Sequence, residues 1–221
     1  MGRRRRYRHR KVDPAPYIVA ACAIALILVW LFARRDDHPA SRRPHLTMDE
    51  ARAYNAGIPF VAGARQPARP FHFHGTPAGR EQAAQCLATA ALYEAGADPI
   101  DQKAVIQVVL NRVRLPHYPG TICGVVYQGS TLPTGCQFSF TCDGSQLRRP
   151  EHDGWEAARR AAKRALAGYV FPDVGQATHY HADWMVPYWI GSLDKIAQVH
   201  SHIFYRGKGA AQPPEQADPT R

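Results

Sequence analysis

The chain has 221 residues, enough for one domain of ordinary size with additional segments but too few for two large domains. Its composition, 45% hydrophobic and 21% charged, is typical of globular proteins and excludes a wholly disordered or fibrous chain. The net charge of +10 is carried mostly by residues 1–43 (+8) rather than by residues 44–221 (+2). This distribution argues against nucleic-acid binding, because that function needs a basic surface on the folded domain itself.

A basic tail precedes an apolar segment at the start of the chain. Residues 1–16 contain seven Lys or Arg, and Tyr17–Ala33 is a run of seventeen residues without charge, Pro or Gly. As a helix this run would be about 25 Å long, the lower limit for crossing a bilayer. The positive-inside rule then predicts a single-pass protein of the inner (cytoplasmic) membrane, with a cytoplasmic N-terminus and its domain in the periplasm or cell-wall space.

Two alternatives compete with this transmembrane signal-anchor. A cleaved signal peptide is one, but the apolar run is long for such a peptide and has no A-x-A site at its end. A buried core helix is the other, but an arginine block rarely precedes one. The arginine run also attracts anionic lipid, and we interpret it mainly as a topology signal.

The remaining chain divides by composition into a linker, a domain and a tail. Residues 34–80 are rich in Pro, Arg, His and Gly and predict an extracytoplasmic linker, in which residues 71–74 form a short strand or a pad against the domain. The domain is expected over residues 81–207. Residues 208–221 are expected to be a disordered tail.

Within the domain, apolar periodicity predicts helices first and strands last. The first helix is expected over residues 81–96, and a second follows, capped by Asp98 with a proline in its first turn. A third is expected over residues 153–167. Two β-like runs follow, Ala177–Ala182 and Ser201–Arg206. The fold class is therefore α+β and mainly helical, with a small late β element, preceded by one N-terminal transmembrane helix.

The cysteines indicate disulfides. One cysteine lies in the apolar segment, and an even four lie in the domain: Cys86, Cys123, Cys136 and Cys142. In an oxidising compartment these four form two disulfides, with three possible connectivities. A zinc site is the alternative, but the spacing of the last two cysteines does not match a zinc knuckle.

Glu94 is the candidate catalytic residue. It shares a helical stripe with Leu87 and Ala91, so its carboxyl is expected to be desolvated, and it lies in the last turn of its helix. Desolvation and the negative end of the helix dipole both favour the protonated form, which a general acid needs. The alternative is a glutamate that reaches solvent or pairs with an arginine such as Arg112.

Aromatic and histidine side chains supply further candidates. Rings, amides and hydroxyls suit sugar binding, although most of the rings should belong to the core. His179 and His181 lie two apart in a β-like run, and His200 and His202 repeat that spacing. These four histidines are an alternative candidate site to Glu94, and they would bind zinc.

Seven ordered segments resemble the SleB-type cell-wall hydrolase family, named for a spore-cortex-lytic enzyme. They read YEAGADP (93–99), QKAVIQVVLNRV (102–113), CGVVYQG (123–129), CQFSFTCDG (136–144), WEAARRA (155–161), ATHYH (177–181) and HIFYR (202–206). The resemblance covers about 120 residues, and its specificity comes from the order of all seven segments. The motif's Arg, Gly and second Glu are replaced here by Gly96, Ala97 and Asp98.

The resemblance implies a lysozyme- or transglycosylase-like fold that cleaves the N-acetylmuramic acid–N-acetylglucosamine β-1,4 bond of peptidoglycan. It assigns the catalytic glutamate to Glu94. The candidate substrate-binding residues are Gln137, Phe138, Ser139, Tyr180, His181, Trp189 and Tyr205, and the candidates behind Glu94 are Asn111 and Asp98. No cofactor and no metal are expected.

A single strong carboxylate favours a lytic transglycosylase mechanism, in which the muramic acid 6-hydroxyl replaces the second carboxylate. Asp98 and Asp143 are weaker candidates for a second carboxylate, which a hydrolase would use. Two other functions stay open at this point, a zinc-dependent peptidoglycan amidase that uses the histidines and a non-catalytic peptidoglycan-binding scaffold.

Overall fold

The structure, a computed structural model, describes residues 23–30, 46–132, 135–147 and 153–209 and divides into two units, residues 1–45 and 46–221. In the first unit, residues 23–30 are helical with exposed side chains. Among the described residues no helix is both long and apolar enough to cross a membrane. The predicted basic tail, most of the predicted membrane segment and most of the C-terminal tail lie outside the described residues.

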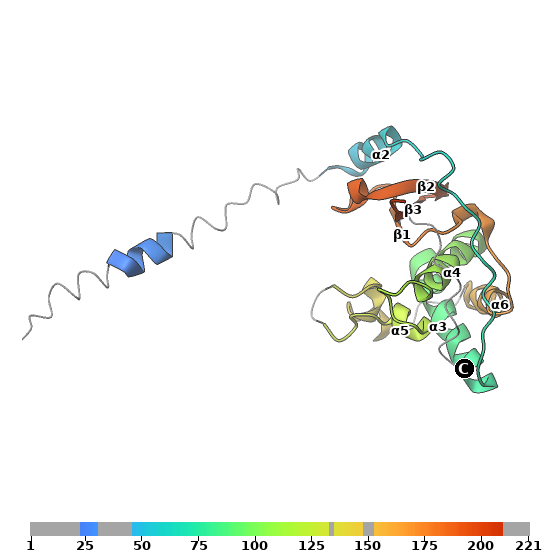
Figure 1. The fold of residues 1–221 in the computed structure, drawn as a ribbon. Helices are drawn as coiled ribbons and strands as arrows, with labels where there is room; N and C mark the ends of the chain where they lie inside the picture. The colour runs from blue at the N-terminus through green and yellow to red at the C-terminus, as the bar shows by residue number, and fades with distance from the viewer. Residues whose placement is uncertain (1–22, 31–45, 133–134, 148–152, 210–221) are drawn as a thin grey trace, which may run out of the picture. The chain divides into compact units, whose positions relative to one another are not determined.

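Three helices form the core of the second unit: α3 (Pro77–Ala95), α4 (Pro99–Val113) and α6 (Trp155–Ala165). They pack against one another, and the short helix α5 (Ile122–Val126) covers α3 and α4 (Figure 1). Alanines line the contact between α3 and α6, so the two helices approach closely.

Caps set the limits of the first two core helices. The Thr76 hydroxyl accepts the Gly79 N–H at 3.1 Å, so α3 begins four residues before the predicted start. Gly96 ends α3 with a φ of 55°, a left-handed value that favours glycine. The Asp98 carboxylate accepts the N–H groups of Ile100 and Asp101, which confirms the predicted cap of α4.

The late β element is an antiparallel sheet of order β1-β3-β2, made of β1 (His179–Ala182), β2 (Leu193–Val199) and β3 (His202–Gly207). Two of these strands were predicted and β2 was not. Because β2 has a register shift between Lys195 and Ala197 and buries both residues, its sequence lacks the alternation of a simple strand.

The sheet has two distinct faces, because neighbouring side chains of a strand alternate. Tyr180 lies opposite Phe204 in the β1–β3 register, and Phe204 packs in the core against Ala104 and Val108 of α4. His181 lies opposite Ile203 and therefore occupies the other face, away from α4.

Part of the predicted linker is folded. Residues 46–80 contain α2 (Met48–Gly57), which begins with a capping box between Thr47 and Glu50. The buried Asn55 amide donates to the carbonyls of Asp183 and Met185 and so fixes α2 to the chain after β1. The predicted strand or pad at residues 71–74 is confirmed, since His72 forms a β-bridge with Ala167.

The four domain cysteines form two disulfides, as predicted. Cys86–Cys123 joins α3 to α5, and Cys136–Cys142 closes a short loop between α5 and α6. The first bond therefore ties helices of the core together, whereas the second shapes a single segment.

Candidate active site

Glu94 lies in the last turn of α3, at the edge of the apolar core. The preceding turn buries Ala90, Ala91 and Leu92, whereas Glu94 is only half-buried. The carboxyl therefore borders the core on one side and solvent on the other. Its place near the helix C-terminus disfavours the negative charge.

Tyr180 of β1 makes the direct contact with this carboxyl. Its hydroxyl donates a hydrogen bond to Glu94 Oε2 at 3.0 Å. Burial raises the pKa of Tyr180, so the hydroxyl stays protonated and remains a donor. The predicted substrate-binding Tyr180 thus contacts the candidate acid itself.

The pKa of Glu94 is raised, and burial is the main cause. The hydrogen bond from Tyr180 and the charges of His202 and Arg112 lower it in part, while the charge of Asp143 raises it further. The protonated form is favoured, and donors near the carboxyl still stabilise the charged form. A carboxyl in such surroundings is suited both to give and to accept a proton.

Arg112 supports the strand that carries Tyr180. It is a buried residue of α4, and its Nε donates to the Thr178 carbonyl at 2.6 Å, just before β1. Its guanidinium also lies over the rings of Tyr118 and Phe138, at 5.5 and 5.6 Å. The sequence predicted Arg112 only as an alternative partner of Glu94, and its bond to the chain before β1 was not predicted.

The segment 135–147 lies beside the end of α3. Phe140 stacks on Tyr93 with ring centroids 4.4 Å apart, and the Tyr93 hydroxyl donates to the Ser145 carbonyl at 3.2 Å. Asp143 of this loop is exposed, and its charge acts on Glu94. The Cys136–Cys142 disulfide therefore constrains the loop that borders Glu94.

Four predicted substrate-binding residues reach the surface at least in part. Ser139 is exposed, and the other three are partly buried: Gln137, Tyr180 and Trp189. Trp189 lies on the opposite face of the sheet from Tyr180, with its ring against those of His181 and Tyr205. Gln137 and Ser139 remain the polar candidates on the loop beside Glu94.

Three other predicted substrate-binding residues are buried, contrary to expectation. Phe138 is 2% exposed and lies in the helical core. Tyr205 is fully buried, and its hydroxyl lies 3.0 Å from Nε2 of His181, itself 6% exposed. The other ring nitrogen of His181 donates to the Ala182 carbonyl at 2.8 Å, so Nε2 accepts from Tyr205.

The two residues predicted to stand behind Glu94 have other roles. The buried Asn111 amide donates to the carbonyls of Gly175 and Ala177, at 2.9 and 2.8 Å, and positions the chain that leads into β1. Asp98 caps α4 and forms an ion pair with His200. Neither residue makes a hydrogen bond to Glu94 in the described part of the chain.

The four-histidine zinc site does not form. His179 and His181 share the face of the sheet that holds Trp189, whereas His202 lies on the Tyr180 face, next to α4. Within the described ranges, the one group with metal-ligand geometry is a different one and contains Asp98, Asp101 and His200. The opposite faces keep the four histidines from forming a single zinc centre.

A Tyr180→Phe substitution tests the contact with Glu94. Loss of the hydrogen bond raises the pKa of Glu94 further, so the alkaline limb of the pH–activity profile should move to higher pH. We expect kcat/KM to fall about tenfold. Turnover measured against pH checks this. The matched control is Tyr169→Phe, which removes the hydroxyl of a tyrosine whose ring lies against Arg164 of α6. An alkaline limb that stays in place in both variants would contradict the assignment.

Comparison with known proteins finds similarity to cell-wall hydrolases. Residues 96–205 match the model of the family described as Cell Wall Hydrolase, a range that begins two residues after Glu94. The spore cortex-lytic enzyme of Halalkalibacterium halodurans is 32% identical over 121 residues, which are 54% of this chain and 33% of that protein. The spore cortex-lytic enzyme of Bacillus cereus is 30% identical over 147 residues, 64% of this chain and 52% of that protein.

The chain thus matches only about a third to a half of these relatives' length. Among solved structures, the catalytic domain of the Bacillus cereus SleB protein is 27% identical, with a TM-score of 0.47. The alignment covers 61% of this chain and 95% of that domain.

Proposed function

Because residues 96–205 match the model of the Cell Wall Hydrolase family, we propose that this protein cleaves the glycan strands of peptidoglycan, with Glu94 as general acid and base. One observation carries the role of Glu94: a half-buried carboxyl with a raised pKa that accepts a hydrogen bond from Tyr180. Glycosidic oxygens are weak bases, so their departure needs an acid that is still protonated near neutral pH.

We propose that the bond cleaved is the β-1,4 linkage from N-acetylmuramic acid to N-acetylglucosamine. Protonated Glu94 gives its proton to the glycosidic oxygen as the bond from that oxygen to the muramic acid anomeric carbon breaks. The resulting carboxylate then takes the proton of the muramic acid 6-hydroxyl, whose oxygen bonds to the same carbon. The product is a 1,6-anhydro sugar, no water is consumed, and Glu94 is protonated again.

The surroundings of Glu94 support this single-carboxylate route over a hydrolase with two catalytic carboxylates. Among the described acids, Asp143 is the one whose charge acts on Glu94, and it is an exposed loop residue. If Asp143 activated a water molecule, the reaction would be hydrolysis with a reducing muramic acid end. On the same loop, Gln137 and Ser139 offer an amide and a hydroxyl for the sugar.

We also propose that the protein is anchored in the cytoplasmic membrane, with its domain in the periplasm or cell-wall space. The support is the sequence of the first 33 residues, in which seven basic residues precede seventeen uncharged ones. The two disulfides agree with an oxidising compartment. Protease digestion of intact spheroplasts should degrade the domain and spare the N-terminal tail.

Digestion of purified sacculi by the full chain tests the proposed reaction. We expect soluble muropeptides that carry 1,6-anhydro-muramic acid, identified by their masses. Reducing muramic acid ends instead would show a hydrolase and contradict the transglycosylase route. Binding to sacculi without release of fragments would contradict cleavage altogether and indicate a scaffold.

A further inference from the structure

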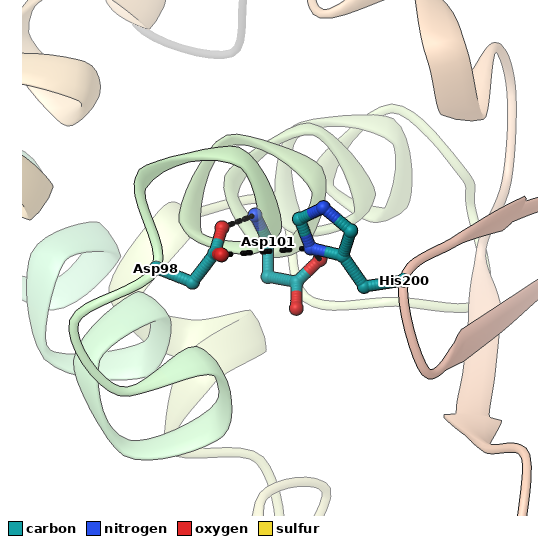
Figure 2. A group of neighbouring side chains, drawn as sticks. All are labelled: Asp98, Asp101 and His200. Atoms are coloured by element: carbon teal, nitrogen blue, oxygen red, sulfur yellow. Dashed lines mark hydrogen bonds and ion pairs between the residues drawn. The ribbon is translucent and has the colours of Figure 1, made fainter.

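A row of aspartate and histidine side chains leads from the surface toward Tyr180, the residue that contacts Glu94. It begins at the start of α4, where Asp98 and Asp101 face His200 in the turn between β2 and β3 (Figure 2). The His200 Nδ1 atom lies 3.5 Å from Asp98 Oδ2 and 3.2 Å from Asp101 Oδ1. This outer part is open to solvent, since the His200 side chain is 54% exposed.

The inner part of the row is buried. The Asp101 side chain is 10% exposed, and its Oδ2 atom lies 3.4 Å from Nδ1 of His202, whose side chain is 14% exposed. Neither Asp101 Oδ1, which faces His200, nor His202 Nδ1, which faces Asp101 Oδ2, has a hydrogen-bond partner among the described residues, so these contacts are ion pairs without hydrogen-bond geometry. A buried polar atom without a hydrogen bond is costly, and attraction between the Asp101 carboxylate and a charged imidazole offsets part of that cost.

His202 also borders the candidate active site. Its ring meets the Tyr180 ring edge-on with centroids 5.7 Å apart, and the Tyr180 hydroxyl is the one that bonds Glu94. The two residues lie on the same face of the sheet, next to α4. The proposed mechanism for Glu94 does not use His202 or Asp101.

We propose that Asp101 and His202 are positioning residues for Glu94: Asp101 fixes the His202 ring, and His202 in its charged form stabilises the Glu94 carboxylate left after proton transfer. This inference rests on the proposed function of Glu94. The other groups that act on Glu94 are Tyr180, Arg112 and Asp143.

Two substitutions separate this role from simple packing. His202→Gln removes the charge next to Glu94, so Glu94 should lose its proton at a higher pH and kcat should fall about tenfold while KM changes little. Asp101→Asn should act in the same direction. Because Asp101 acts through His202, the double variant should resemble His202→Gln alone rather than show the product of both effects.

The matched control is His200→Asn. It removes an imidazole from the same Asp101 carboxylate, but on the solvent side, and asparagine tolerates the left-handed backbone at this position (φ 44°). We expect the pH–activity profile of this variant to match that of the unaltered protein. A merely structural role for His202 would lower the active fraction without moving the alkaline limb.

Titration of the Glu94 side-chain carbon by NMR, in the full chain with labelled glutamate and with Glu94→Gln for assignment, gives a readout that needs no activity. A titration of Glu94 that is the same in the unaltered protein and in His202→Gln would overturn the inference. Failure to digest sacculi, with the titration shifted as expected, would instead overturn the proposed function alone.

A divalent cation is the competing explanation for the outer cluster, because the ligand atoms of Asp98, Asp101 and His200 lie within 4.8 Å of one another. We expect zinc chloride and EDTA to leave the Glu94 titration unchanged. A shift with zinc that is lost in His200→Asn would show a cation site and would contradict the charge-pair inference.

Discussion

Glu94→Gln should abolish the release of muropeptides from sacculi, with a loss of at least about a thousandfold in rate. Glutamine keeps the size of the side chain and still accepts the Tyr180 hydrogen bond, but it has no proton to give to the leaving oxygen. Release of soluble fragments over time, quantified by mass, measures the loss. Turnover within tenfold of the unaltered protein would remove Glu94 from the acid–base role.

The same variant should be more stable than the unaltered protein at neutral pH. Burial raises the pKa of Glu94, so between its ordinary and its raised pKa the folded state binds more protons than the unfolded state. The free energy of unfolding therefore falls as pH rises through this window, and glutamine removes that dependence. Urea denaturation of both proteins at pH 4 and pH 8 measures the difference. Equal stability of the two proteins at pH 8 would show that burial does not destabilise the charged form of Glu94.

Loss of the Cys86–Cys123 disulfide should lower the free energy of unfolding by about 4 kcal/mol, because the bond closes a loop between cysteines 37 residues apart. The bond joins α3 to α5 in the core, so its removal frees a long part of the unfolded chain. Urea denaturation of a double alanine variant measures the effect, which corresponds to a drop in Tm of roughly 10 °C.

The Cys136–Cys142 disulfide provides the comparison. Its cysteines are six residues apart, so its removal should cost only about 2 kcal/mol. Because this loop borders Glu94, we expect its removal to reduce glycan cleavage more than stability. Equal effects of the two disulfides on stability would contradict the loop-length argument.

The helices could be predicted because their signals are local. The Asp98 cap, the proline that follows it and Gly96 mark the junction of α3 and α4 in the sequence itself. The capping box of Thr47 and Glu50 is an equally local signal for α2, but the surrounding Pro- and Gly-rich composition obscured it. Strand β2 had no such signal, because its bulge breaks the alternation of buried and exposed residues.

The candidate site was predictable only where one helix was enough to define it. The apolar stripe of α3 placed Glu94 next to the core, and the structure agrees with a desolvated carboxyl. The contact with Tyr180 joins residues 86 positions apart and depends on the register of the sheet. The same register decides that His181 and His202 lie on opposite faces, which the H-x-H spacing alone does not reveal.

The position of β3 has a consequence for how the molecule is made. β3 is the central strand of the sheet and also its last element in the chain, so β1 has no pairing partner until the final described residues have been synthesised. Helix α3 with Glu94 emerges far earlier, but without Tyr180 beside it. A nascent chain would thus lack the contact between Tyr180 and Glu94 until β3 has been synthesised, and a chain that terminates before β3 would not form it.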